Sequence, residues 1–222
     1  MTELYIYHHL GLGDHVICNG LVREYAAKYD RVHLFCKVHN VPSVSAMYSD
    51  INVTCIPASD ADAQQFIQQN PGNNYLVIGF NLMNDVVSFD KQFYDLSNIP
   101  FACRWSSFHC PRTFNEIKLF NSIHRHDRYA VVHEDTARGY CIDHRRIKLP
   151  EVEVKHRPGF NLSDYRVLLE FAEEIHVIDS SMLFFVDSLP ELAHHKLFVH
   201  RYARNNLPFH IPVLQHNWTI LE

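Results

Sequence analysis

The chain has 222 residues, enough for one domain or two small ones. Hydrophobic residues make up 47% of it and charged residues 20%, a globular balance that excludes collagen-like, coiled-coil and disordered classes. The formal net charge of -5 argues against a protein whose main role is to coat nucleic acid. We find no apolar run of the roughly 18 residues that a membrane span needs, and no signal-peptide pattern at the N-terminus.

Cysteine and histidine usage gives no sign of a metal centre. The six cysteines are widely spaced, and the sequence contains neither C-x-x-C nor H-E-x-x-H. Adjacent histidines such as His8-His9 are expected by chance in a chain with 17 histidines. We therefore expect a cytoplasmic protein with no bound metal or cofactor.

The N-terminal part alternates short apolar runs with helical stretches. Strands are expected at 4–8, 31–36, 51–57 and 74–80. Helices are expected from the Gly13 region to about 29, at 41–49 and at 59–69, the last with Ser59 or Asp60 as its N-cap. Such alternation predicts a parallel sheet covered by helices.

The pattern pauses in the middle of the chain and then restarts. Residues 81–127 are expected to form a helical crossover and linker, with a helix at 114–123 and an aromatic-rich stretch at 89–108 that we interpret as core packing between two halves. Further strands are expected at 128–135, 175–181 and 196–200, and helices at 161–174 and 181–189. The tail, 207–221, is expected to add a strand or helix. This restart predicts an α/β fold of two small Rossmann-like halves with a cleft between them; one continuous sheet is the alternative.

A glycine turn follows the first expected strand. The sequence HHLGLGDH places Gly11, Gly13 and Asp14 between that strand and the next helix. Ligands bind at this end of parallel strands, and glycine allows a close approach of the backbone. The pattern lacks the third glycine of G-x-G-x-x-G, and Lys37 stands where a nicotinamide-binding protein has an acid, so an oxidoreductase is disfavoured. The alternative is a tight turn with Asp14 capping the helix.

Two segments carry a family resemblance. The strand–G-x-G-D-x-(I/V)–helix opening at 10–16 resembles GT-B glycosyltransferases, in particular the heptosyltransferase-like (ADP-heptose:lipopolysaccharide) group. The segment 175–189, in which Asp-Ser-Ser precedes an apolar helix, is similar to that group's nucleotide-binding half. The resemblance implies an acceptor-side domain at 1–125 and a donor-binding domain at 126–222. The chain is shorter than members of the group and lacks their second-half glycine-rich segments, so a reduced form with altered or lost activity stays open.

The resemblance also implies roles for individual residues. Asp14 corresponds to the general base that activates the acceptor hydroxyl, and the turn before the apolar helix contacts the donor. The expected donor-binding residues are Gly11, Gly13, His133, Glu134, Arg138, Asp179, Ser180 and Ser181. Possible acceptor or phosphate contacts are His15, Arg145 and Arg146, with Lys148, Lys155 and Arg157 as further basic candidates. The alternative for the basic run 144–148 is a solvated loop.

The expected function is sugar transfer from a nucleotide sugar to a glycan or other hydroxyl acceptor, without metal. One alternative is a metal-dependent GT-A transferase that uses Asp60 and Asp62, which form a D-x-D pattern but also suit the first turn of a helix. Another is a non-catalytic binding or scaffold protein that keeps a reduced transferase fold. Neither the donor, the acceptor nor the oligomeric state follows from the sequence.

Overall fold

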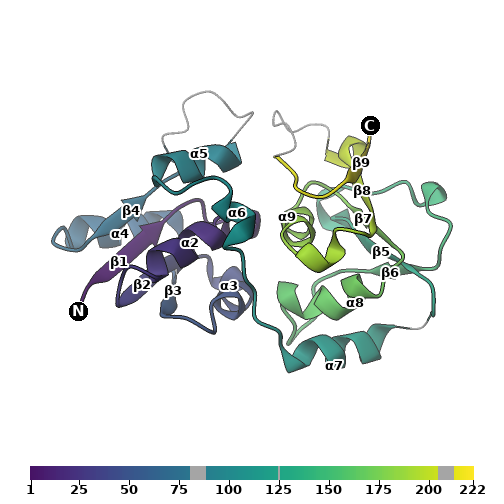
Figure 1. Cartoon of the computed structure of the whole chain (residues 1–222), viewed down its shortest axis with the longest axis horizontal. Helices are drawn as coiled ribbons and strands as arrows, with labels where there is room; N and C mark the ends of the chain where they lie inside the picture. The colour runs from purple at the N-terminus through teal and green to yellow at the C-terminus, as the bar shows by residue number, and fades with distance from the viewer. Residues whose placement is uncertain (81–88, 125, 205–212) are drawn as a thin grey trace. The chain divides into compact units, whose positions relative to one another are not determined.

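The chain forms two compact units. The computed structural model describes residues 1–80, 89–124, 126–204 and 213–222 (Figure 1). The units are Met1–Pro111 and Arg112–Glu222, and each is described by itself. The division falls earlier than the expected boundary at 125, because helix α7 (Phe114–Ile123) packs against η5 (Leu162–Tyr165) and α8 (Arg166–Glu170). The Thr113 hydroxyl, at the start of α7, also donates to Asp164 at 2.7 Å.

The first unit contains a parallel sheet of the expected kind. Its strand order is β3-β2-β1-β4, and the strands are β1 (Glu3–Tyr7), β2 (Arg31–Cys36), β3 (Val53–Pro57) and β4 (Tyr75–Val77). The central strands carry the core, with Ile6, Val32 and Leu34 fully buried. All four strands were predicted, β4 with three residues rather than seven.

Helices connect the strands of the first unit. They are α1 (Leu12–Ile17), α2 (Asn19–Ala26), η1 (Val38–Asn40), α3 (Val41–Met47), α4 (Asp60–Gln69), α5 (Phe89–Leu96) and α6 (Cys103–Ser106). The single helix expected to reach residue 29 is two helices, because the backbone leaves helical geometry at Cys18, where ψ is 2°. Ser59 is the N-cap of α4, as predicted.

Helix α2 approaches α6 very closely at Gly20. A Cβ atom there would lie 1.9 Å from the Cys103 carbonyl oxygen. Tyr94 of α5 closes the same region, since its buried hydroxyl donates to the Ile17 carbonyl at 2.7 Å. The buried aromatic residues Phe93 and Tyr94 therefore pack inside the first unit, whereas we had interpreted the stretch 89–108 as packing between the halves.

The second unit contains a larger parallel sheet. Its strand order is β6-β5-β7-β8-β9, and the strands are β5 (Ala130–His133), β6 (Glu151–Glu153), β7 (Glu174–Val177), β8 (Lys196–His200) and β9 (Trp218–Leu221). Strand β6 was not predicted, because its sequence EVE is short and mostly charged. The helix expected at 161–174 is the shorter pair η5 and α8.

The remaining elements of this unit connect its strands. They are η3 (Thr136–Arg138), η4 (His144–Arg146), α9 (Ser181–Asp187), η6 (Pro190–Leu192) and η7 (Arg201–Arg204). The expectation for the tail holds at 218–221, where the chain forms β9; residues 207–212 of the tail lie outside the described residues.

Asp187 fixes the tail beside β8. Its fully buried carboxylate accepts hydrogen bonds from the backbone N–H groups of Gln215 and His216 and from the Trp218 indole, all at 2.9 to 3.0 Å. A buried carboxylate needs such donors, since an unsatisfied charge is strongly destabilising. The polar interaction therefore holds the chain where β9 can pair with β8.

All six cysteines are free. In the described part of the chain, every helix is too short or too polar to pass through a bilayer.

We predict that Gly20→Ala destabilises the protein by about 2 kcal/mol, measured by urea unfolding. Alanine gains up to about 1 kcal/mol of helix propensity over glycine, but the overlap with the Cys103 carbonyl forces α2 and α6 apart, and overpacking costs about 1–3 kcal/mol. Gly72→Ala is the matched control, because no atom lies within 4 Å of a Cβ there. Equal unfolding midpoints for the two variants would contradict the prediction.

Candidate functional site

The carboxyl edge of the first sheet gathers the turn that the sequence singled out. The chain leaves β1 through His8, His9 and Leu10, and Gly11 is the N-cap of α1 in extended conformation. The Leu10 carbonyl accepts a hydrogen bond from the buried Asn40 amide at 3.1 Å, which ties this turn to the loop after β2. Parallel pairing thus places the turn beside the residues that follow β2, as expected.

Asp14 is the third residue of α1 and lies partly buried beneath this turn. Burial raises the pKa of its carboxyl to about 7, against the lowering effects of the Gly11 backbone N–H and the Lys37 charge. A Cβ atom on Gly11 would lie 2.5 Å from Asp14 Oδ2, so glycine is what allows the carboxyl to sit there. The N-cap of α1 is Gly11, without a side-chain capping hydrogen bond, so Asp14 is an acidic residue of the first turn rather than the cap of our structural alternative. Its pKa is suited to a base near neutral pH.

Two buried histidines lie next to this turn, and Lys37 is a charged residue that acts on the Asp14 pKa. His8 and His15 are fully buried, and their ring centroids lie 4.5 Å apart. The His8 Nδ1 donates to the His9 carbonyl at 2.6 Å, and burial lowers the pKa of His8 to about 4. Burial also lowers the pKa of His15. Since its ring has no exposed surface, His15 cannot make the acceptor or phosphate contact that we expected of it in this structure.

Lys37 is the residue that sequence reasoning missed at this edge. We read it only as the absence of a nicotinamide-binding acid. It directly follows β2, next to β1 in the sheet, and its charge acts on Asp14. The sequence could have indicated Lys37 as a candidate, because it directly follows an expected strand and ligands bind at that end of parallel strands.

The two aspartates of the D-x-D pattern, Asp60 and Asp62, lie in the first turn of α4. The Asp62 carboxylate accepts hydrogen bonds from the Ser59 backbone N–H and hydroxyl at 2.9 and 2.6 Å, which completes a capping box. Asp60 accepts a hydrogen bond from the Tyr7 hydroxyl at 3.0 Å. Across the described ranges, the structure contains no group of three His, Cys, Asp or Glu side chains that could hold a metal ion. The capping interpretation is confirmed for Asp62, and the metal-dependent alternative gains no support from these residues.

The carboxyl edge of the second sheet gathers basic groups around the Asp-Ser-Ser turn. Asp179 follows β7 and is buried, and burial raises the pKa of its carboxyl while Arg204 and Arg201 lower it. Arg201 Nη1 lies 3.4 Å from Asp179 Oδ2, and Arg204 donates to the Asp179 carbonyl. Ser180 is the N-cap of α9, and its buried Oγ has no hydrogen-bond partner within the described residues. Ser181 is the first residue of α9.

Arg201 and Arg204 were absent from the sequence-based candidates. They lie in η7, directly after β8, and Asp179 lies two residues after the end of β7. Because β7 and β8 are neighbours in the sheet, the two loops meet at one edge. The signal was again a basic residue directly after an expected strand.

The three donor-side candidates after β5 have partners of their own. His133 Nδ1 donates to the Val154 carbonyl at 3.3 Å, and burial lowers the pKa of its ring. Glu134 accepts from the Ile142 backbone N–H at 2.7 Å. Arg138 forms an exposed ion pair with Asp135. The structure therefore places His133 and Glu134 as supports for the loop and leaves Arg138 on the surface.

The basic run 144–148 is largely solvated, the alternative that we had kept open. Arg145 is 90% exposed and pairs with Asp143 at 2.8 Å. Arg146 differs, because its guanidinium lies over the Tyr202 ring of η7, 5.1 Å from the ring centroid. Among the basic residues of the run, Arg146 thus contacts Tyr202 of η7. Lys155 pairs with Glu153 at 2.8 Å.

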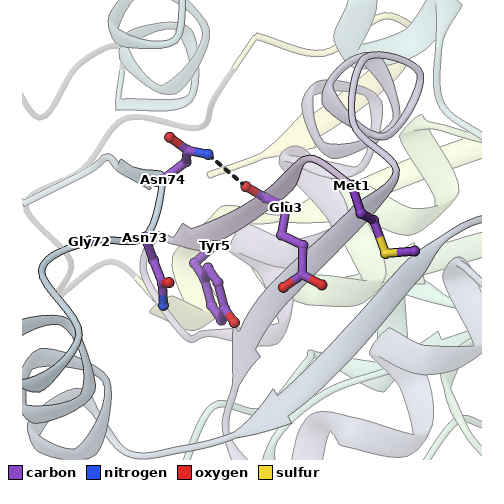
Figure 2. Close-up of a pocket in the computed structure, with 6 residues that line it drawn as sticks. All are labelled: Met1, Glu3, Tyr5, Gly72, Asn73 and Asn74. Carbon is purple, nitrogen blue, oxygen red and sulfur yellow. Dashed lines mark hydrogen bonds between the residues drawn. The ribbon is translucent and has the colours of Figure 1, made fainter.

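The pocket of Figure 2 lies elsewhere. It is a polar hollow of about 260 Å³ in the first unit, lined by Met1, Glu3, Tyr5, Gly72, Asn73 and Asn74. Asn74 closes one side by donating to the Glu3 carbonyl at 3.1 Å. Apart from Tyr5, in the middle of β1, these residues begin or precede β1 and β4, so the hollow is at the amino edge of the sheet. It contains none of the sequence-based candidates.

We predict that Asp14 makes stability fall as the pH rises. Its folded-state pKa of about 7 lies above the pKa of an unfolded aspartate, so the folded chain holds an extra proton between about pH 4 and pH 7. Stability linked to this proton is lost through that window. Urea unfolding at pH 5.5 and pH 8 should show wild type losing stability relative to Asp14→Asn, in which the titration is absent.

The same carboxyl can be followed directly. The ¹³C resonance of the Asp14 side chain should titrate with a midpoint near 7. A midpoint near 4, together with no pH-dependent difference between wild type and the asparagine variant, would show that the carboxyl is not desolvated.

Comparisons with known proteins bear on the fold. Neither the protein-family models nor the curated proteins gave a match to this chain. A solved structure, the glycosyl transferase family 9 protein from Veillonella parvula DSM 2008, is similar with a TM-score of 0.55 and 8% sequence identity. The similarity covers 99% of this chain and 86% of that chain. The chain therefore shares the fold of that structure and consists of two Rossmann-like α/β units.

Proposed function

We propose that the chain is a glycosyltransferase that moves a sugar from a nucleotide sugar to a hydroxyl acceptor without a metal. The observation that carries the proposal is the Asp14 carboxyl, which burial brings to a pKa of about 7 at the carboxyl edge of the first sheet. The similarity in fold to a glycosyl transferase family 9 structure supports this reaction class. A fold alone does not imply an activity, so the site has to carry the argument.

Asp14 is the proposed general base. A base works best when its pKa lies near the working pH, and an aspartate with an ordinary pKa would be a much weaker base. Above pH 7 the carboxylate accepts the proton of the acceptor hydroxyl as that oxygen bonds to the anomeric carbon. Lys37 supplies positive charge beside the carboxylate and Gly11 allows its position.

The second unit is the proposed donor side. As the new bond forms, the bond between the anomeric carbon and the diphosphate oxygen breaks, and the nucleoside diphosphate leaves with the electron pair. Positive groups and N–H donors near that diphosphate stabilise the developing charge. Arg204 and Ser180 are suited to this task, because Arg204 Nε and Ser180 Oγ are buried atoms without a hydrogen-bond partner in the described part. Arg204 also carries the guanidinium fork that matches phosphate oxygens.

The neighbouring candidates take supporting roles. Arg138 and Arg145 are held by exposed ion pairs, which contribute little to stability, so either guanidinium can turn to a phosphate at little cost. Asp179 is the anchor for Arg201 and Arg204 rather than a ligand contact.

We predict that the protein binds nucleoside diphosphates in the presence of EDTA. ADP, GDP, UDP, CDP and the matching nucleotide sugars are tested by thermal shift and saturation-transfer NMR, each with EDTA or with manganese. A ligand present at 100 times its dissociation constant stabilises the fold by about 2.7 kcal/mol, which gives a clear shift. Binding that appears only with manganese would favour the metal-dependent alternative, and no binding in any condition would favour a scaffold protein.

We further predict that Asp14→Asn lowers turnover of the bound donor by about 100-fold or more, since general base catalysis contributes about 10²–10⁴-fold. Turnover is measured as release of nucleoside diphosphate. Asp62→Asn is the matched control, because Asp62 is also the third residue of a helix after a strand of this sheet. It should keep turnover within about twofold. Equal turnover in wild type and Asp14→Asn would remove Asp14 from the mechanism.

A further inference from the structure

A chain of hydrogen bonds runs through the interior of the second unit. His176 on β7 and His200 on β8 are both buried, and their Nδ1 and Nε2 atoms lie 2.9 Å apart. On one side, His176 Nε2 lies 3.4 Å from a Glu174 carboxylate oxygen. On the other side, His200 Nδ1 lies 2.7 Å from the Tyr202 hydroxyl, which belongs to η7. This series of hydrogen bonds thus links the start of β7 to the carboxyl edge of the sheet.

The position of each proton in this chain follows from the contacts. The Glu174 carboxylate can only accept, so a neutral His176 donates from Nε2 and accepts at Nδ1. At the other end the Tyr202 oxygen accepts from the Asp143 backbone N–H at 2.7 Å, and the Tyr202 hydroxyl proton goes to His200 Nδ1. A neutral His200 then carries its own proton on Nε2 and donates to His176 Nδ1. His176 in turn carries its proton on Nε2 and donates to Glu174, whose carboxylate also contacts Lys196 at 3.2 Å. Each of the two neutral imidazoles therefore donates one hydrogen bond and accepts one.

The order of donors and acceptors fixes the orientation of the Tyr202 hydroxyl, and Tyr202 joins two segments of the second unit. Its hydroxyl holds the Asp143 amide, which begins the turn η4, and its ring lies under the Arg146 guanidinium. Tyr202 also stands between Arg201 and Arg204, which bind Asp179. One side chain therefore connects the 143–146 segment to the basic residues after β8.

We propose that Tyr202 is a positioning residue: its hydroxyl, oriented by His200, His176 and Glu174, fixes the 143–146 segment so that Arg146 can bind the diphosphate of the ligand. The diphosphate part of this inference rests on the proposed function. The fixed tautomers and the fixed segment do not, because they follow from the contacts within the second unit alone.

Tyr202→Phe tests the inference, because it removes the hydroxyl and keeps the ring beneath Arg146. Three measurements are made on the full chain. They are the imidazole tautomers by ¹⁵N NMR, with His200 assigned through a His200→Gln variant, the hydrogen exchange of the Asp143 amide, and the affinity for pyrophosphate and the four nucleoside diphosphates. Tyr129→Phe is the matched control, since that hydroxyl donates to the Leu168 carbonyl at 2.8 Å in the same unit.

The wild type should show both His176 and His200 protonated on Nε2. Tyr202→Phe should release the His200 tautomer, speed exchange of the Asp143 amide about tenfold and weaken diphosphate binding about 5- to 10-fold, the loss that corresponds to one hydrogen bond. Tyr129→Phe should lower the unfolding temperature but leave the His200 tautomer, the Asp143 exchange and the affinities within about twofold of wild type.

Two results would overturn the inference. One is a wild-type His200 protonated on Nδ1, and the other is an unchanged Asp143 exchange rate in Tyr202→Phe. If the wild type binds none of the diphosphates, the proposed function fails and so does the diphosphate role of Arg146. The tautomer and exchange measurements still decide whether Tyr202 positions the segment, so the two failures can be told apart.

Discussion

Parallel pairing of the strands is the constraint on which the rest of the structure depends. In each unit every strand runs in the same direction, so the loops that follow the strands meet at one edge. This brings Lys37 into the electrostatic range of Asp14, and the residues of η7 beside Asp179. Residues far apart in the sequence thereby share one environment, which is why the polar chemistry of the chain gathers at these two edges.

Three aspartates show how differently the fold treats the same side chain. Asp187 is fully buried and satisfied by backbone and indole N–H groups, so it anchors the tail. Asp179 is buried beside two arginines, so it anchors η7. Asp14 forms no ion pair within the described residues, and its desolvation outweighs the Gly11 N–H and the Lys37 charge, so its pKa rises to about 7. A carboxyl whose pKa is strongly raised by desolvation is a candidate for a functional rather than a structural role.

Much of the fold could be predicted from residue patterns. Apolar runs located β2 and β8 at their observed bounds, and helical spacing did the same for α7. The capping residues at the start of α4 were also readable, because Ser59 and Asp62 act locally. Strand β6 could not be predicted, since three residues with two glutamates carry no periodic signal and owe their conformation to pairing with β5. The boundary between the units was misplaced for a similar reason, because the packing of α7 on α8 is a long-range contact.

In the candidate site, too, some features could be predicted from neighbouring residues and others depend on tertiary packing. The sequence by itself determined which residues follow each strand and that glycine precedes Asp14, because these are properties of neighbouring positions. Only the tertiary structure decided that His15 is enclosed, that Arg201 and Arg204 hold Asp179, and that Tyr202 ends a hydrogen-bonded chain through two strands. Burial and partner choice depend on which elements pack together, and that packing is set by the whole fold rather than by any local pattern of residues.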